Sequence, residues 1–269
     1  MSRYARCFEK LASRNEGAFV PFVVLGDPTP AASREVVEAL VSGGADMLEL
    51  GIPFSDPVAD GPTIQAADRR ALSAGTRPRD ALGLVAEVRA AHPELPIGLL
   101  VYANLVEAPG RRRFYGEAAA AGVDSVLVAD VPTLECGPYA EDALAAGIEP
   151  VLIAAPNASD SALDRLAHTC RGYTYVVSRV GVTGTEDEAG LDHQSFIADL
   201  QRRGAPPALL GFGISSPEQV RAALAAGAAG AISGSAVVKR IEQHLDDPLA
   251  RSESLTAFVA TMKAATTGV

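Results

Sequence analysis

The chain has 269 residues, of which 48% are hydrophobic and 21% charged, and its formal net charge is −10. These values are ordinary for a soluble globular protein, and the length suffices for a large α/β barrel with a substantial core. The acidic balance argues against nucleic-acid binding, which needs clustered Lys and Arg, and no apolar run reaches the ~18 residues of a membrane span. The three cysteines are far apart and the N-terminus lacks the apolar core of a signal peptide, so we expect a cytoplasmic protein.

Short β-rich runs alternate with Ala-rich helical stretches from one end of the chain to the other. We expect eight strands, at residues 19–25, 47–50, 97–102, 125–129, 151–154, 174–177, 209–212 and 231–233. Helices are expected between them, for example after Thr29 and Ser216, where an N-cap residue precedes a proline. Two further helices are predicted at residues 4–14, before the first strand, and at residues 248–265, near the end of the chain.

Four of the expected helices end on a glycine and pass directly into a strand. Glycine permits the left-handed conformation that ends a helix, and these glycines are Gly44, Gly122, Gly147 and Gly227. Their intervals of 78, 25 and 80 residues correspond to three, one and three repeats of about 26 residues. Eight βα units of this size predict a single (β/α)8 TIM barrel domain over residues 1–269, with the extra N-terminal and C-terminal helices added to it.

A glutamate stands in the second expected strand, where the neighbouring residues are apolar. Glu49 lies between Leu48 and Leu50, and burial of a carboxylate is costly unless it is paired or neutral. Two interpretations are open: a carboxylate bonded to a polar group of a neighbouring strand, or a general acid/base whose pKa is raised by apolar walls. We favour the general acid/base, because barrel enzymes place catalysis at the C-terminal ends of their strands.

The loop after this strand, residues 51–62, contains three prolines, two glycines and two aspartates. Its restricted conformation suits the holding of a second carboxylate at the mouth of the barrel. Asp56 and Asp60 are the candidates, and the capping of a turn is the alternative role for either of them.

Two glycine-rich turns follow the seventh and eighth expected strands, at residues 211–215 and 234–235. Barrels bind phosphate at these positions, because glycines let backbone N–H groups approach an anion at the start of a helix. Ordinary tight turns are the alternative.

Residues 178–190, after the sixth strand, are polar with three glycines and fit either a closing lid or a surface loop. The sequence contains no recognisable Ser/His/Asp triad or cluster of metal ligands, so we expect no metal.

Residues 48–65 read LELGIPFSDPVADGPTIQ, and this long stretch resembles the tryptophan synthase alpha subunit family. Shorter motifs of the family follow in the same order: GVD at 122–124, ADVP at 129–132, GVTG at 181–184, GFGI at 211–214 and ISGS at 232–235. The resemblance implies a (β/α)8 lyase of L-tryptophan biosynthesis. Such an enzyme cleaves indole-3-glycerol phosphate to indole and D-glyceraldehyde 3-phosphate by a retro-aldol reaction, without a metal or organic cofactor.

The resemblance also implies roles for individual residues. Glu49 matches the general acid/base that protonates indole C3 and helps to deprotonate the glycerol hydroxyl. Asp60 matches the carboxylate that bonds the indole N–H and stabilises its positive charge, and Thr183 is implied to bond Asp60 from the lid. The implied substrate-binding residues are Phe22, Leu100, Tyr102, Leu127, Ala129, Ile153, Tyr175 and Thr183. The implied phosphate-binding residues are Gly184, Phe212, Gly213, Ile214, Gly234 and Ser235.

A partner is implied as well, a beta subunit that contains pyridoxal phosphate (PLP) and receives indole in an α2β2 heterotetramer. The loop around Asp56 would face that partner. We expect no PLP in this chain, because its lysines Lys10, Lys239 and Lys263 are predicted on helices away from the strand ends. Three alternatives remain: a lyase that releases free indole without a partner, a catalytically silent regulatory subunit, and another phosphosugar barrel such as an isomerase.

Overall fold

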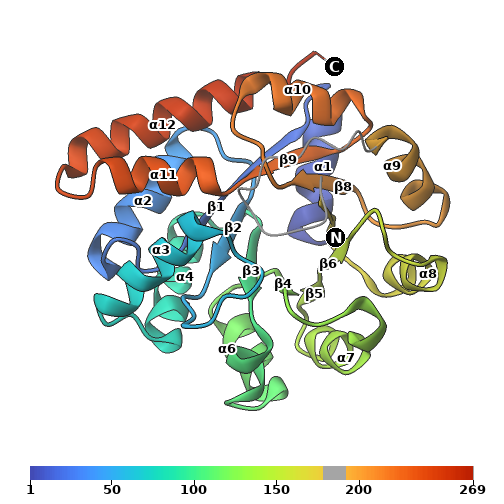
Figure 1. The fold of residues 1–269 in the computed structure, drawn as a ribbon, viewed down its shortest axis with the longest axis horizontal. Coiled ribbons are helices and arrows are strands. Elements are labelled where there is room, and N and C mark those ends of the chain that lie inside the picture. The colour runs from blue at the N-terminus through green and yellow to red at the C-terminus, as the bar shows by residue number, and fades with distance from the viewer. Residues whose placement is uncertain (178–191, 269) are drawn as a thin grey trace.

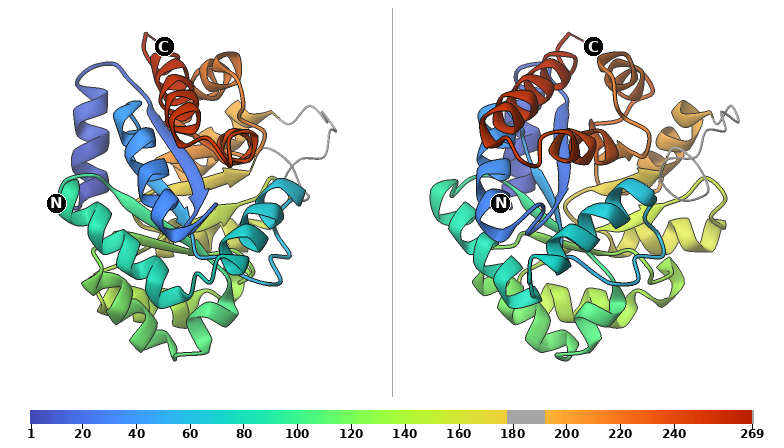
Figure 2. Two further views of the ribbon diagram at one scale, coloured as in Figure 1. Left: turned by 90° about the vertical axis from the view of Figure 1, so that its left-hand side faces the viewer. Right: turned by 60° about the vertical axis from the view of Figure 1, so that its left-hand side comes forward.

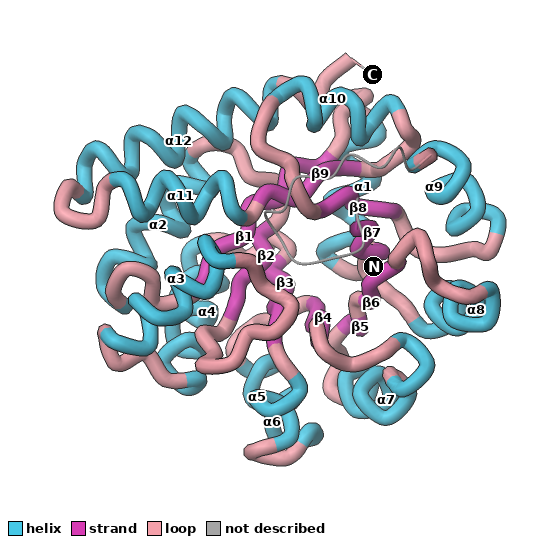
Figure 3. The backbone as a smooth tube through the Cα atoms, in the orientation of Figure 1, coloured by secondary structure: helices cyan, strands magenta, loops and turns pink. Residues whose placement is uncertain are grey.

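The structure is a computed structural model, and it describes residues 1–177 and 192–268. Within these residues, nine parallel strands lie in the order β5-β4-β3-β2-β1-β9-β8-β7-β6. The strands form a nearly closed barrel with helices around it, which confirms the expected TIM barrel (Figures 1 and 3). The strands are β1 (Ala18–Val24), β2 (Leu48–Gly51), β3 (Ile97–Val101), β4 (Ser125–Val128), β5 (Glu149–Pro150), β6 (Leu152–Ala154), β7 (Thr174–Val177), β8 (Ala208–Gly211) and β9 (Gly230–Ser233).

The fifth expected strand, at residues 151–154, is divided in the structure. β5 pairs with β4 and β6 pairs with β7, and only Val151 separates the two short strands. Pro150 has no N–H to donate to a strand ladder, and the pairing of the chain changes from β4 to β7 at this point. β5 and β6 together occupy one position in the barrel, so the nine strands fill the eight expected positions.

Helices surround the strands, and α1 is seen behind them in the view of Figure 1 (Figures 1 and 2). They are α1 (Arg3–Ala12), α2 (Pro30–Ser42), α3 (Pro62–Ser73), α4 (Pro78–Ala91), α5 (Ala103–Glu107), α6 (Arg111–Ala120), the 3-10 helix η1 (Thr133–Glu135), α7 (Gly137–Ala145), α8 (Asp160–Thr169), α9 (His193–Arg202), α10 (Pro217–Ala225), α11 (Ser235–Gln243) and α12 (Pro248–Ala264). None of these described helices has both the length and the apolar character that crossing a bilayer requires.

The two extra helices are present as expected. α1 lies at the N-terminal end of the barrel, where the Tyr4 hydroxyl is hydrogen-bonded to Ser125 Oγ over 2.7 Å at the start of β4. α12 packs against α2 and α11 on the outside of the barrel (Figure 2). The opposite end of the barrel, where the strands finish, is therefore not covered by α1.

Local sequence signals account for the ends of several helices. The Ser216 side chain accepts from the N–H of Gln219, whose own side chain completes a capping box. At the start of α2 the Thr29 side chain accepts from the N–H of Ala32. The four glycines of the repeat all adopt positive φ, between 79° and 97°. An L side chain rarely adopts this conformation, so each glycine lets a helix end immediately before the next buried strand.

Alternation along the strands separates an inner from an outer core. In β1, Phe19 and Val23 pack in the larger apolar cluster with the helices, whereas Phe22 packs with side chains of the barrel interior. The strand register then brings interior residues of different strands to one level. Phe22 pairs with Glu49, Leu100 pairs with Leu127, and Ile153 pairs with Tyr175. The register therefore places the buried Glu49 carboxyl beside the apolar side chain of Phe22.

Candidate active site

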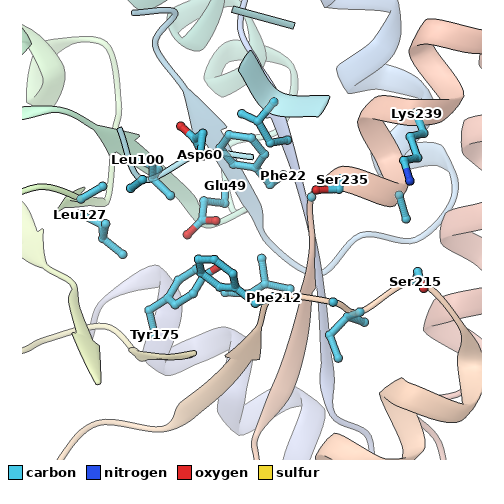
Figure 4. Close-up of a pocket in the computed structure, with 18 of the residues that line it drawn as sticks. Phe22, Glu49, Asp60, Leu100, Leu127, Tyr175, Phe212, Ser215, Ser235 and Lys239 are labelled. Carbon is cyan, nitrogen blue, oxygen red and sulfur yellow. The ribbon is translucent and has the colours of Figure 1, made fainter. Parts of the chain in front are cut away.

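A cavity of about 510 Å³ opens where the strands end, a volume that suits a small organic ligand (Figure 4). Most of the expected site residues line it: Phe22, Glu49, Asp60, Leu100, Leu127, Ala129, Ile153, Tyr175, Phe212, Gly213, Ile214, Gly234 and Ser235. In Figure 4 the Glu49 and Asp60 carboxyls lie on the same side as Leu100 and Leu127, away from Ser235. Thr183 and Gly184 lie outside the described residues, as does the expected lid at 178–190.

The Glu49 carboxyl is buried, with 1% of the residue exposed, and it also borders the cavity. Burial raises its pKa to about 7, and the charge of Asp60 contributes to the increase. The Tyr173 hydroxyl donates a hydrogen bond of 2.7 Å to Glu49 Oε1, which opposes part of that increase. The carboxyl thus has a raised pKa and a polar partner, and that partner lies just before β7 and not on a strand that neighbours β2.

Asp60 and Asp56 differ in their surroundings, although both belong to the loop between β2 and α3. Asp60 lines the cavity, and burial raises the pKa of its carboxyl. Asp56 is exposed and accepts a hydrogen bond from the neighbouring Ser55 hydroxyl. Of the two candidates from the sequence, only Asp60 is therefore placed to act on a ligand in this cavity.

Tyr102 is not among the residues that line the cavity, in contrast to the expectation from sequence. Its ring stacks on Phe54, with centroids 5.3 Å apart and planes inclined by 23°. Its hydroxyl donates a hydrogen bond of 2.6 Å to Asp60 Oδ2 and accepts one from the Ala59 N–H. Tyr102 therefore contacts the Asp60 carboxylate but is not itself part of the cavity lining. This hydrogen bond also opposes the increase in the Asp60 pKa.

The other end of the cavity has the features of an anion site. Phe212 and Gly213 both adopt positive φ, 65° and 79°, and this conformation is costly for phenylalanine. The Ser233 hydroxyl donates to the Ile214 carbonyl oxygen over 2.7 Å, so it joins the turn after β8 to the end of β9. α11 begins immediately afterwards, at Ser235. N–H groups in the first turn of a helix lack partners within the helix and favour a negatively charged ligand.

Several cavity residues were not singled out from the sequence as site residues, although Ser215 belongs to the glycine-rich turn at residues 211–215. Besides Ala59, Ile64, Ile232 and Ala236, the additional residues are polar and lie near the anion site: Ser215, Lys239, Arg240, Gln243 and Ser254. The prediction that Lys239 lies away from the strand ends is wrong, because α11 begins directly after β9 and only Gly234 separates them. Lys239 follows Ser235 by four residues, so the two share one face of the helix (Figure 4). That spacing is the signal that was available in the sequence.

Apolar side chains form the remaining wall of the cavity. Tyr175 and Phe212 contact each other edge to face, with ring centroids 6.1 Å apart. A side chain at Gly211 would overlap the Tyr175 hydroxyl, so glycine is needed for this packing. Nowhere in the described residues do three or more His, Cys, Asp or Glu side chains gather as a metal site would require. The cavity thus offers two carboxyls, an apolar wall and the start of a helix that favours an anion.

Comparison with known proteins agrees with these features. The family model for the tryptophan synthase alpha chain matches residues 8–267. The alpha chain of Aeromonas hydrophila is 58% identical over 266 residues, with 99% of each chain covered. The solved alpha subunit of Legionella pneumophila has a TM-score of 0.87 and 31% identity, and the match covers 99% of this chain and 98% of that chain.

A structure of the tryptophan synthase α2β2 complex from Pyrococcus furiosus also matches. Its TM-score is 0.83 and its identity 34%, with 93% of this chain and 98% of that chain covered. The match to the family extends over nearly the whole of this chain and includes both ends of the cavity. The chain therefore belongs to the tryptophan synthase alpha chain family, and it is a lyase that cleaves indole-3-glycerol phosphate in tryptophan biosynthesis.

Proposed function

We propose that the cleavage is a retro-aldol reaction in the cavity at the barrel mouth, with Glu49 as general acid/base and Asp60 as the stabiliser of positive charge. The observation that carries this proposal is the Glu49 carboxyl, which is buried, borders the cavity and has a pKa of about 7. Such a carboxyl is present in both protonation states near neutral pH. A group that gives a proton and then takes one back requires this property.

The proposed steps balance without any further reactant. Glu49 gives its proton to indole C3, and the ring nitrogen becomes positively charged while its N–H is bonded to the Asp60 carboxylate. The glycerol hydroxyl then returns a proton to Glu49 and its carbon becomes the aldehyde carbon. The electron pair of the broken carbon–carbon bond returns to the ring, which leaves neutral indole. The fixed Asp60 charge lowers the energy of the cationic stage, where it is most needed.

The two ends of the cavity suit the two ends of this substrate. We assign the indole and glycerol to the side with Phe22, Leu100, Leu127, Ala129, Ile153 and Tyr175, where apolar walls can hold a planar ring. The phosphate is assigned to Phe212, Gly213, Ile214, Gly234 and Ser235, at the start of α11. Thr183 and Gly184 complete the glycerol and phosphate sites in this proposal, although both lie outside the described residues.

A beta subunit is proposed as the partner, in an α2β2 heterotetramer like that of the Pyrococcus furiosus protein. Exposed apolar side chains support a docking surface near the cavity mouth, since Val58 beside Asp56 is 70% exposed and Leu134 is 51% exposed. The beta subunit would carry PLP and receive indole from this chain, which itself needs no cofactor. We place this single-domain barrel, residues 1–269, in the cytoplasm.

An assay of indole release from indole-3-glycerol phosphate tests the proposed function. The purified chain is expected to release indole and glyceraldehyde 3-phosphate slowly by itself, and much faster with a tryptophan synthase beta chain. Fast release that a beta chain does not alter would identify a lyase that acts without a partner. If no indole formed even with the beta chain, the retro-aldol proposal would fail.

Lys239 provides a further prediction, because it is the lysine at the phosphate end of the cavity. Its positive charge is expected to favour binding of the phosphate rather than the chemical step. In Lys239→Gln, the KM for indole-3-glycerol phosphate should rise about 3–10-fold, while kcat changes by less than about twofold. The KM of the variant should also depend less on ionic strength.

Lys10→Gln is the matched control, because Lys10 lies on α1 at the opposite end of the barrel. This control should have the KM of the unmodified enzyme. A Lys239→Gln variant with unchanged KM and unchanged salt dependence would show that the Lys239 charge does not contribute to phosphate binding.

A further inference from the structure

Asp68 is a buried carboxyl for which the proposed mechanism has no use. It lies on α3 and is 4% exposed, and burial raises its pKa to about 7. Asp68 Oδ1 accepts a hydrogen bond of 3.3 Å from the Phe54 N–H, and its Oδ2 has no partner among the described residues. Leaving a buried carboxyl oxygen unpaired is costly. The hydrogen bond to Phe54 connects Asp68 to the loop between β2 and α3.

A continuous series of contacts leads from Asp68 to the Asp60 carboxylate. The Phe54 backbone is bonded to Asp68, and the Phe54 ring stacks on Tyr102. The Tyr102 hydroxyl donates to Asp60 Oδ2 over 2.6 Å. α3 also holds the other end of this loop, because Gln65 Nε2 donates to the Asp60 carbonyl oxygen over 2.8 Å. Both ends of the loop between β2 and α3 are thus attached to α3.

We propose that Asp68 is a positioning residue for the lyase reaction, which fixes Phe54 so that Tyr102 in turn holds Asp60 toward the substrate. This inference rests on the role proposed for Asp60. The geometry assigns Asp68 no contact with the substrate, because it is absent from the residues that line the cavity. Its effect therefore passes through the β2–α3 loop, and small displacements of a reacting group are known to have large effects on rate.

The charges around Asp68 indicate which property of its side chain matters. Asp60 and Asp27 both raise its pKa, and Arg69 lowers it. Arg70 is bonded to Asp27 through two nitrogens, at 2.7 and 2.9 Å. With a pKa of about 7, Asp68 is partly neutral at neutral pH. A neutral side chain with the same shape and an acceptor oxygen should therefore hold the Phe54 N–H equally well.

Substitutions at Asp68 test this proposal. In Asp68→Ala, which removes the acceptor, kcat should fall about tenfold, the equivalent of one lost hydrogen bond. The affinity for glycerol phosphate, measured as an inhibition constant, should stay within about twofold, because the phosphate end is not touched. Asp68→Asn keeps the acceptor and should retain at least about half of kcat. Thr76→Val, which changes another buried polar side chain, is the matched control and should have the kcat of the unmodified enzyme.

A direct readout accompanies the kinetics. Hydrogen exchange of the Phe54 amide should be faster in Asp68→Ala and unchanged in Asp68→Asn. Unchanged kcat in folded Asp68→Ala would overturn the proposal, and so would a loss of kcat with normal Phe54 exchange. Asp68→Leu, which has the same number and branching of side-chain heavy atoms but no acceptor, replaces the alanine variant if that variant does not fold. Absence of indole release by the unmodified enzyme would instead refute the proposed function, while the exchange result would still report on the loop.

Discussion

Replacement of Glu49 by glutamine is expected to lower kcat for indole release by about 10²–10⁴-fold or more, the range typical of a lost general acid/base. Glutamine retains the shape of the side chain and can still accept the Tyr173 hydrogen bond, but it cannot give or take a proton near neutral pH. The affinity for glycerol phosphate should change little, since the anion site lies at the other end of the cavity. Steady-state kinetics and an inhibition constant for glycerol phosphate measure both effects.

Stability provides the control for this variant. The Glu49 pKa is about 7 in the folded protein against an ordinary value of 4.5, so the unfolded chain releases this proton at lower pH than the folded chain. The contribution of Glu49 to the free energy of unfolding therefore decreases as the pH rises from 4.5 to about 7. Glutamine does not titrate, so Glu49→Gln should be at least as stable as the unmodified protein at pH 8 in urea unfolding. Near-normal kcat in this folded variant would refute the role of Glu49.

Replacement of Asp60 by asparagine is expected to lower kcat by about 10²–10³-fold, the effect of removing one preorganised electrostatic partner from a transition state. Asparagine can still accept the Tyr102 hydrogen bond, so the loop should remain in place while the negative charge is lost. Binding of glycerol phosphate should be retained, since it does not involve an indole ring. Kinetics together with calorimetric binding of glycerol phosphate separate the two effects.

Two results for Asp60→Asn would contradict this role. If glycerol phosphate no longer bound, Asp60 would have to act in phosphate binding rather than in charge stabilisation. If kcat were unchanged, the cationic stage of the reaction would not depend on this carboxylate. Tyr102→Phe is a useful companion, because it keeps the Asp60 charge and removes the hydroxyl that donates to Asp60 and accepts from the Ala59 N–H.

The barrel itself could be predicted from the sequence because its signals are local. The glycines that end helices have a required backbone conformation, and their spacing counts the βα units without reference to the rest of the fold. Glu49 could be identified for a similar reason, since a carboxyl in an apolar strand is conspicuous in sequence. The division between β5 and β6 was missed, because it depends on which neighbours each half of the strand pairs with.

The contacts that tune the site could not be predicted in this way. Tyr173 reaches Glu49 across 124 residues of sequence, and only the closed barrel brings them together. Tyr102 was expected in the pocket, but its orientation depends on the stacking with Phe54. Asp68 shares the buried face of α3 with Ile64 and Ala71, but the helical spacing does not show that its carboxyl accepts from the Phe54 N–H. In each case the deciding information is a contact between elements that are separate in the sequence.

The separation of the two carboxyl pKa values is the most direct test of the account. A titration of the Glu49 and Asp60 side-chain carbons, followed by ¹³C NMR in selectively labelled protein, would measure both values in the free enzyme. We predict a pKa of about 7 for Glu49. The proposed stabilisation of positive charge requires that Asp60 be ionised near neutral pH, so that a proton donor stands beside a fixed negative charge. A Glu49 pKa near 4.5, or an Asp60 pKa above that of Glu49, would contradict this division of roles.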